Sequence, residues 1–494
     1  MANVYFLVSI YAILTFITNF PSGFTNSTVN TAISQLRSFI NDSYIHRGIN
    51  LSAAQMLFVQ SAVMNCWFVA QVFGSLYTPW VMDRLGRRKG YMIAVLMTLI
   101  ATAVQYFSIL YKYPEMLIVG RTIAALSSPI ADTSLMLYMQ ETSPIHLRGM
   151  ASFFCEIGYG AMCALGGVLG MRNVLGYDFA LLILIAAIPE ALSLVFLFFI
   201  PETPKYLLIT KGDRRSAERS LEFFQGKQED NELILDEYEK EKELDNVNKK
   251  RSSFKEVFTT WHLREAIYIT TAVSVLSLAF FPILQSSTFF FFECGISRNH
   301  AELSTTILLV VFTIACVAGA SFVDKFPRRL LIIVFGTIST VFLLCFAISS
   351  MCTEMADWVK FFAVGCIIAF CISHGLVMGP ITWFIAPEMV SQRHKATVFA
   401  ASFAISNILI SITDFIIIPL FKHIGGLSFI LVFVIPSTFS LIYLYLYLPE
   451  TRGRQTHQII ASMMRKNKKV ATNTDGTGYK VFDVSSTVGE PVKV

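Results

Sequence analysis

The chain has 494 residues and is dominated by long apolar runs, each close to the length that crosses a membrane. A hydrocarbon core of about 30 Å requires roughly 20 apolar residues in an α-helix. Twelve runs meet this length: about 4–32, 55–80, 89–111, 115–139, 149–171, 177–200, 265–292, 302–323, 330–350, 358–386, 396–421 and 426–448. The sequence therefore predicts an all-α polytopic membrane protein with twelve transmembrane helices.

The composition excludes an ordinary soluble protein. Charged residues make up 15% of the chain, against about 25% in typical soluble domains, and hydrophobic residues make up 54%. The net charge of +5 is small, so we predict membrane lipids as partners and no nucleic acid. The nine cysteines form no CxxC or Cys/His pattern, so we predict no metal site and no cofactor.

A polar stretch divides the chain into two sets of six spans. We predict an N-terminal six-helix half at 1–201, a cytoplasmic helical linker at 202–263, a C-terminal six-helix half at 264–449 and a tail at 450–494. The linker has alternating charges, which are typical of surface helices. The tail is polar, and we predict that it is mostly disordered.

The basic residues predict the orientation. With a cytoplasmic N-terminus, more than half of the Lys and Arg residues fall in the linker and tail, and the short inner loops also hold more than the outer ones. Both termini are then cytoplasmic, and we expect a plasma-membrane protein. The sequon at Asn41 lies in the first outer loop and predicts a glycan. The terminal Val492-Lys493-Val494 would fit a PDZ-type partner.

Short charged motifs repeat in the two sets of spans. Those of the first set are Asp83, Arg87, Arg88, Glu141, Arg148 and Glu202, and those of the second are Asp324, Arg328, Arg329, Glu388, Arg393 and Glu450. The matched positions lie 241 to 248 residues apart, always after corresponding spans. A duplicated six-span unit is a transporter architecture. We predict that these residues, together with Arg121, form ion-pair networks that open and close an inner gate.

These motifs resemble those of the sugar porter family of the major facilitator superfamily, which includes the facilitative glucose transporters. The resemblance covers roughly residues 20–455. It depends on Asp83–Arg88, Gly120-Arg121, Glu141–Gly149, Pro201–Tyr206, Gly379–Phe384 with Glu388, and Pro449–Gly453. It implies the twelve-helix major facilitator fold and transport by alternating access.

The substrate-contacting positions implied by the resemblance differ from the family pattern. The span-seven motif is reduced to Leu276-Ser277, and the family glutamine of span five is Glu156. A hexose would miss several hydrogen bonds, at about 1–3 kcal/mol for each unpaired group. The predicted substrate-binding residues are Glu156, Ser277, Gln285, His374, Trp383 and Asn30.

Ionisable residues inside spans are costly and are functional candidates. Arg121 matches the family arginine of span four, which pairs with a span-one aspartate in proton-coupled members. Here the matching stretch, ending at Asn26, contains no acid. This favours a uniporter, whereas Asp132, Glu156 and His374 leave proton coupling open.

The sequence is compatible with three functions. No nucleotide-binding loop or nucleophile motif is visible, so we predict that the chain is not an enzyme. The preferred function is facilitative uniport of a small solute, such as a hexose or a polyol. One alternative is a proton-coupled transporter or a transporter of charged organic solutes that uses Glu156, Asp132 or His374. The other is a transport-inactive nutrient sensor.

Overall fold

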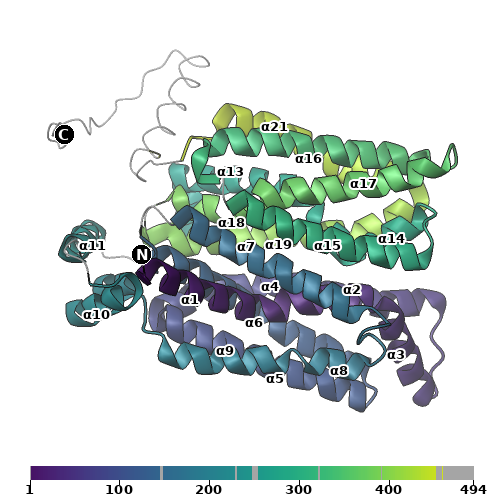
Figure 1. Cartoon of the computed structure of the whole chain (residues 1–494), viewed down its shortest axis with the longest axis horizontal. Helices are drawn as coiled ribbons and strands as arrows, with labels where there is room; N and C mark the ends of the chain where they lie inside the picture. Colours follow the sequence, from purple (N-terminus) through teal and green to yellow (C-terminus); the bar gives the residue numbers. More distant parts are fainter. Residues whose placement is uncertain are drawn as a thin grey trace.

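The computed structural model describes residues 2–144, 148–227, 231–246, 254–320, 323–390, 392–451 and 459. Within these ranges every regular element is a helix (Figure 1). The first six spans are α1 (Ala2–Asn19) with η1 (Phe20–Phe24) and α2 (Thr25–Thr31), α4 (Ala53–Leu85), α5 (Arg87–Leu110), α6 (Pro114–Thr142), α7 (Arg148–Gly170), and α8 (Phe179–Leu184) with α9 (Ala187–Phe199).

The second six spans follow the same plan. They are α13 (Trp261–Ser277) with α14 (Phe280–Glu293), α15 (Arg298–Ala320), α16 (Arg328–Met351), α17 (Asp357–Ser373) with η5 (His374–Met378) and α18 (Gly379–Glu388), α19 (Gln392–Ile424), and α20 (Leu427–Phe429) with η6 (Ile430–Val434) and α21 (Ile435–Tyr447). The prediction of an all-α, twelve-span membrane protein is confirmed.

Ten of these spans in the described ranges are long and apolar enough to cross a membrane by length and composition alone. The other two are α4 and α6. Both contain many polar residues, among them Gln71 in α4 and Arg121 and Asp132 in α6, which lower their mean hydropathy. The helices that are least apolar are therefore those that contribute polar groups to the interior of the bundle.

Several spans are interrupted, and the interruptions have local causes. The wide turn η1 contains Pro21, and η5 ends immediately before Gly379 and Pro380. Proline lacks an amide hydrogen and clashes with the preceding turn, so it disturbs the regular hydrogen-bond ladder. In α14, Ser286 has non-helical backbone angles. The regular α-helical geometry is therefore interrupted within spans one, seven and ten.

The two sets of spans pack against each other along their length. The N-terminal set lies below the C-terminal set in Figure 1, with α4 in contact with α19, α7 with α15, and α2 with α14. The predicted boundaries at 201 and 449 fall between helices, whereas the boundary at 263 falls in the first turn of α13. As a division into domains, these boundaries stay a prediction.

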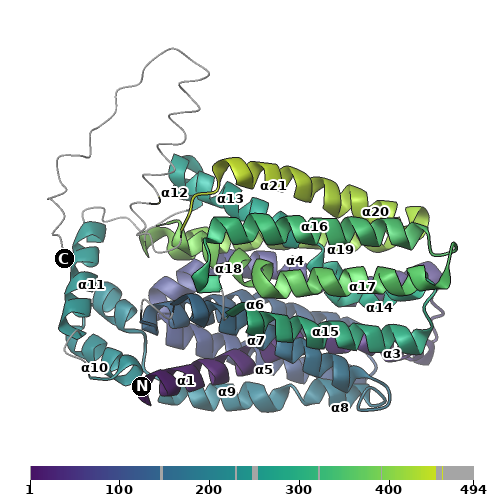
Figure 2. The ribbon, with the colours of Figure 1, turned by 45° about the horizontal axis from the view of Figure 1, so that its top comes forward.

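The linker is helical, and its first part is attached to the N-terminal set. It contains η3 (Tyr206–Lys211), α10 (Arg214–Gln225), α11 (Asn231–Asn246) and α12 (Phe254–Thr259). Gln225 of α10 donates a hydrogen bond to the carbonyl oxygen of Thr142 at 3.0 Å, and Phe224 packs edge-on against Tyr138. The helices α10 and α11 lie at one end of the bundle, which we call the linker end (Figure 2).

The opposite end of the bundle contains α3 (Ile33–His46), and we call it the α3 end. Asn41 was expected in a loop, but it is an exposed residue of α3. The helix forms because its apolar residues Leu36 and Ile40 recur one turn apart and are fully buried. Asn41 lies on the free face, so glycosylation there stays a prediction. The predicted tail and its PDZ-type terminus lie almost entirely outside the described residues.

Close packing of α4 against α6 depends on Gly74. A methyl group placed on Gly74 would lie 2.5 Å from the carbonyl oxygen of Leu126, which belongs to the backbone and cannot move alone. We expect Gly74→Ala to lower the free energy of unfolding by about 1–3 kcal/mol through overpacking. Thermal unfolding in detergent measures this change.

Gly365 provides the matched control for this substitution. It also lies inside a helix, α17, but nothing lies within 4 Å of an added methyl group. Gly365→Ala should leave stability unchanged or raise it by up to about 1 kcal/mol, because alanine favours helices. Equal effects of the two substitutions would show that the α4–α6 contact does not limit stability.

Candidate functional site

A central cavity lies between the two sets of spans. Its volume is about 120 Å³. Its polar lining from the N-terminal set is Asn19, Ser22, Asn26, Gln71, Asp132 and Glu156. Its polar lining from the C-terminal set is Ser274, Ser277, His374, Thr382, Ser406 and Asn407.

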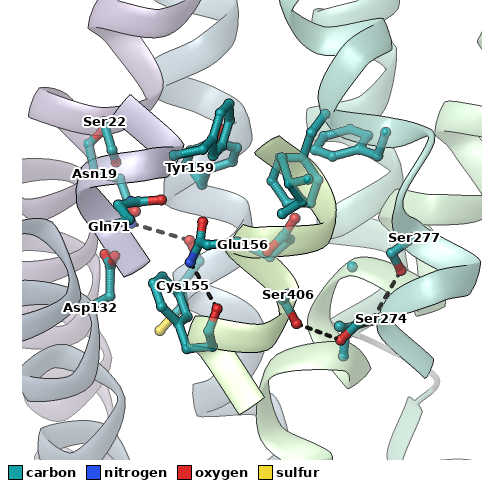
Figure 3. A pocket seen from close by; sticks show the side chains of 18 of the residues that line it. Asn19, Ser22, Gln71, Asp132, Cys155, Glu156, Tyr159, Ser274, Ser277 and Ser406 are labelled. Carbon is teal, nitrogen blue, oxygen red and sulfur yellow. Dashed lines mark hydrogen bonds between the residues drawn. The ribbon is translucent and has the colours of Figure 1, made fainter. Parts of the chain in front are cut away.

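The N-terminal wall carries the carboxylates and most of the amides (Figure 3). Asn19 is held in place by donating to the carbonyl oxygens of Thr15 at 2.9 Å and Cys155 at 3.2 Å. Gln71 donates to the hydroxyl of Ser128 at 3.0 Å. This wall therefore presents positioned amide groups beside two acidic side chains.

The C-terminal wall carries mainly hydroxyl groups that bond to one another. Ser406 donates to Ser274 at 2.9 Å, and the hydroxyls of Ser277 and Thr382 lie 3.1 Å apart. The amide of Asn407 donates to a backbone carbonyl of its own helix at 2.9 Å. These hydrogen bonds satisfy much of the wall without a bound solute.

Aromatic rings surround the polar groups of the cavity. The imidazole of His374 stacks on Phe280 with ring centres 4.0 Å apart, and its Nδ1 has no hydrogen-bond partner among the described residues. Phe68 of α4 meets Phe281 of α14 edge-on at 5.8 Å, which joins the two sets of spans. The cavity is thus a mostly apolar space with a few placed polar groups, as small-molecule sites are.

Glu156 and His374 approach the same point from opposite walls. A methyl group on Gly379 would lie 2.8 Å from Oε1 of Glu156 and 3.0 Å from Nε2 of His374. Glycine at this position lets the carboxylate and the imidazole come close to the backbone of α18. The structure therefore brings two of the predicted substrate-binding residues together.

Arg121 lies apart from the charged networks at the linker end. It is 3% exposed, and its Nη2 donates to the Oδ1 of Asn26 at 2.9 Å. The guanidinium carbon lies 5.8 Å from the ring centre of Trp67. Arg121 therefore lies in the first third of α6, beside an amide and away from the charged motifs, and its part in a gating network stays a prediction.

The N-terminal motifs converge at the linker end on the start of α5. Arg87 forms a buried ion pair with Glu141, with Nη2 and Oε1 2.7 Å apart. Glu202 accepts hydrogen bonds from the backbone N–H groups of Arg87 and Arg88 at 3.0–3.2 Å. Burial raises the pKa of the Glu202 carboxyl, although the N–H groups of Thr203 and Arg88 act in the opposite direction. Glu202 therefore takes up a proton at a higher pH than an exposed glutamate does.

The C-terminal motifs repeat this arrangement around the start of α16. Arg328 forms an ion pair with Glu388, and its backbone N–H donates to Glu450 at 3.0 Å. The backbone N–H of Arg329 also donates to Glu450, and its guanidinium donates to the carbonyl oxygen of Tyr445 at 2.5 Å. The sequence repeat is thus a structural repeat, with corresponding residues in corresponding contacts.

Four of the predicted site residues have side chains that the structure does not describe. Side chains of Arg148, Asp324, Trp383 and Arg393 lie outside the described part of the structure. The remaining member of the gating set, Asp83, lies close enough to Arg87 for the two charges to attract each other.

Two predicted substrate contacts, Asn30 and Gln285, are not among the residues that line the central cavity. The amide of Asn30 in α2 instead donates to the carbonyl oxygen of Leu284 in α14 at 2.8 Å. Asn30 is one helical turn beyond Asn26, where the two sets of spans meet at the α3 end. Gln285 adjoins the same contact.

Sequence reasoning missed Asn19, Gln71 and Asn407 as cavity residues. Each is an amide inside an apolar run, so the signal that singled out Glu156 was also present here, but in a weaker form. A neutral amide costs less than a charge inside a membrane, and many such residues only join helices.

Comparisons with known proteins agree with this geometry. The sequence profile of a family described as "Sugar (and other) transporter" matches residues 7–462. The chain is 23% identical over 471 residues to facilitated glucose transporter member 7 of solute carrier family 2 from Mus musculus, covering 92% of this chain and 90% of that protein. It is 24% identical over 448 residues to member 1 from Gallus gallus, covering 88% and 89%.

Solved structures show the same fold. The proton:xylose symporter XylE bound to 6-bromo-6-deoxy-D-glucose superposes with a TM-score of 0.78 at 18% identity, covering 93% of this chain and 100% of that chain. An inward-open structure of the xylose transporter XylE from E. coli has a TM-score of 0.69 at 17% identity, covering 92% and 99%. The twelve-helix major facilitator fold is confirmed.

Proposed function

The chain belongs to the sugar porter family of the major facilitator superfamily, whose members are transporters and not enzymes, and on that premise we propose that it carries a monosaccharide or a polyol across the membrane by alternating access. The observation that carries this proposal is the central cavity between the two sets of spans. Transporters with duplicated halves bind their solute at such an interface. The relatives named above are glucose and xylose transporters.

The cavity chemistry supports a hydroxylated solute. Gln71, Asn19 and Glu156 place amide and carboxylate groups on one wall, and hydroxyl groups stand on the other. Each hydroxyl of a sugar needs a partner when it leaves water. Aromatic rings around these groups suit the apolar faces of a sugar ring.

Facilitative uniport is the preferred mode. The hydrogen-bond partner of Arg121 is Asn26, which cannot exchange a proton near neutral pH. A second candidate, transport coupled to protons or transport of cationic organic solutes, is favoured by Asp132 and Glu156. The described lining of the cavity contains no Lys or Arg that would neutralise these two carboxylates.

Uptake into proteoliposomes tests the proposal. A labelled panel of hexoses, polyols, organic cations and organic anions would be supplied first at equal pH on both sides and then with an inward proton gradient. Gradient-independent uptake of a hexose or a polyol is expected. Uptake that needs the gradient would support coupled transport, and a ligand that binds without flux would support a nutrient sensor.

The Glu156→Gln substitution tests whether this carboxylate binds the solute. The substitution keeps the shape and one acceptor but removes the charge, and charge-assisted hydrogen bonds are the stronger ones. We expect the KM for the solute to rise about tenfold with little change in folding. Glu354→Gln, an exposed glutamate outside the cavity, is the matched control. Unchanged KM values in both variants would remove Glu156 from the binding site.

We propose that the networks around Arg87 and Arg328 lie on the cytoplasmic side and form part of an inner gate. We also propose that both termini are cytoplasmic, that the protein is at the plasma membrane, and that Asn41 carries a glycan. Protease protection of tagged termini and a mobility shift of Asn41→Gln after deglycosylation test the orientation and the glycan respectively.

A further inference from the structure

A second, smaller cavity lies within the N-terminal set of spans. It adjoins the central cavity, because Ser22, Trp67 and Asp132 line both. Its other polar lining residues are Thr18, Thr98, Ser128, Glu190 and Ser193. These residues come from spans one, three, four and six, so the small cavity is enclosed by a single set of spans.

Glu190 of α9 lines this cavity and has one carboxylate oxygen without a hydrogen-bond partner in the described structure. Its side chain is buried, with 1% of the residue exposed, and Oε1 accepts a hydrogen bond from the hydroxyl of Thr102 at 3.0 Å. Oε2 has no hydrogen-bond partner among the described residues. Buried polar atoms are almost always paired, so a bare carboxylate oxygen inside a membrane span requires an explanation.

The hydroxyl groups around the cavity cannot supply the missing partner, because their hydrogens are already used. Ser128 donates to Oδ2 of Asp132 at 3.0 Å. The others donate to backbone carbonyl oxygens: Thr18 to Leu14, Thr98 to Val95 at 2.8 Å, and Ser193 to Pro189 at 2.9 Å. Each hydroxyl oxygen therefore keeps only lone pairs to offer. Oxygen lone pairs are the ligands of hard cations.

The charges around the small cavity also favour a bound cation. The described lining residues include two carboxylates and no Lys, Arg or His. Nearby titratable groups from the packed helices are Tyr91 of α5 and Cys155, Glu156 and Tyr159 of α7. Tyrosine and cysteine are ordinarily uncharged near neutral pH, and Glu156 adds a third carboxyl group rather than a base. The one neighbouring base on α6, Arg121, is hydrogen-bonded to Asn26. Isolated negative charge at membrane depth is costly unless a cation neutralises it.

We propose that the small cavity is a binding site for a small monovalent cation, a proton or a sodium ion, held between Glu190 and Asp132. The shared chemistry is a compact positive charge with oxygen ligands. The site is separate from the solute cavity but shares Asp132 with it. Cation binding is therefore linked to solute binding, and by thermodynamic reciprocity each changes the affinity for the other.

The test uses the purified full-length protein in detergent, without any sugar. Thermal unfolding would be followed as choline chloride is replaced by NaCl at constant ionic strength, and separately as the pH is lowered. We expect a saturable rise of Tm with one of the two cations, because a ligand that binds only the folded state stabilises it. The titration that saturates identifies the cation.

Glu190→Gln and Asp132→Asn should each weaken the apparent affinity for that cation about tenfold or more, because each removes a charged ligand. The matched control is Asp414→Asn. Asp414 is also buried in a span, with both carboxyl oxygens lacking hydrogen-bond partners in the described structure, but it lines neither cavity. We expect its response to NaCl to equal that of the wild type. In the pH titration, Asp414→Asn removes only the proton uptake of Asp414 itself, and we expect the response of the small cavity to remain.

Two results would overturn the proposal. One is a wild-type protein whose Tm responds to neither titration in a saturable manner. The other is an unchanged response in both Glu190→Gln and Asp132→Asn. Asp132 borders the large cavity, so its substitution is tolerated more readily if Glu190→Gln fails to fold. Since no sugar is present, the outcome is independent of the solute transport proposed above.

Discussion

Arg87→Ala is expected to lower the free energy of unfolding by about 3–5 kcal/mol, which is the usual cost of removing one partner of a buried ion pair. The guanidinium contacts Oε1 of Glu141 through Nε at 3.1 Å and Nη2 at 2.7 Å. Both side chains are at most 10% exposed. Without Arg87, the buried carboxylate loses the cation that compensates its desolvation. Unfolding in detergent, followed by the change in helical signal with temperature or denaturant, measures the loss.

Arg214→Ala is the matched control for this prediction. Arg214 of the linker also forms ion pairs, with Asp236 and Glu239, both at 2.9 Å. These side chains are 41–51% exposed, so water already solvates the charges and we expect a change of at most about 1 kcal/mol. Losses of equal size in the two variants would mean that burial does not decide the strength of the Arg87 pair.

Joining α2 to α14 with a cross-link is expected to abolish nearly all transport. The side chain of Asn30 lies within 2.8 Å of the backbone of Leu284, so Asn30→Cys with Leu284→Cys places two thiols close together at the α3 end. Alternating access requires the two sets of spans to separate at each end in turn. A short, reducible bifunctional thiol reagent would hold this end closed. Solute uptake before reaction, after reaction and after reduction measures the effect.

A cross-link within one set of spans is the control for this experiment. Nη1 of Arg47, the residue that follows α3, and Oε1 of Glu115 in α6 lie 3.0 Å apart, and Arg47→Cys with Glu115→Cys joins segments of the same set of spans. Transport should persist when this link forms. The wild type receives the same reagent as a control for reaction with its own nine cysteines, all of which are at least partly buried. Full transport with a complete Asn30–Leu284 link would rule out separation at this end.

The fold could be predicted from the sequence because its two main determinants are local. The length of each apolar run is set by membrane thickness, and the charged motifs recur at nearly constant offsets. The interruptions at η1 and η5 could not be placed in this way. A proline within a span predicts a disturbance, but whether the helix kinks or widens depends on the neighbouring helices. The segment that forms α3 was assigned to an outer loop because it is more polar and lies between two apolar runs.

The cavity could be predicted only in part. Glu156 and His374 were found because an ionisable group inside a span is costly and therefore informative. The position of Asn30 outside the cavity lining could not be predicted, because sequence spacing gives the face of a helix and not the depth at which the two sets of spans meet. Glu190 follows Pro189 in a strongly apolar run, and its importance depends on Thr102 and Asp132 from other helices. No spacing within one span could reveal that contact.

The two cavity walls differ in chemistry, and this difference affects how tightly a solute would be bound at each stage of the transport cycle. The N-terminal wall holds both carboxylates, whereas the hydroxyls of the C-terminal wall, Ser274 with Ser406 and Ser277 with Thr382, already bond to one another. A solute bound chiefly by Glu156 and Gln71 would keep the same principal partners in every conformation. Its dissociation constant at the two faces of the membrane would then be nearly the same. Such a carrier would transport its solute about equally well in both directions across the membrane.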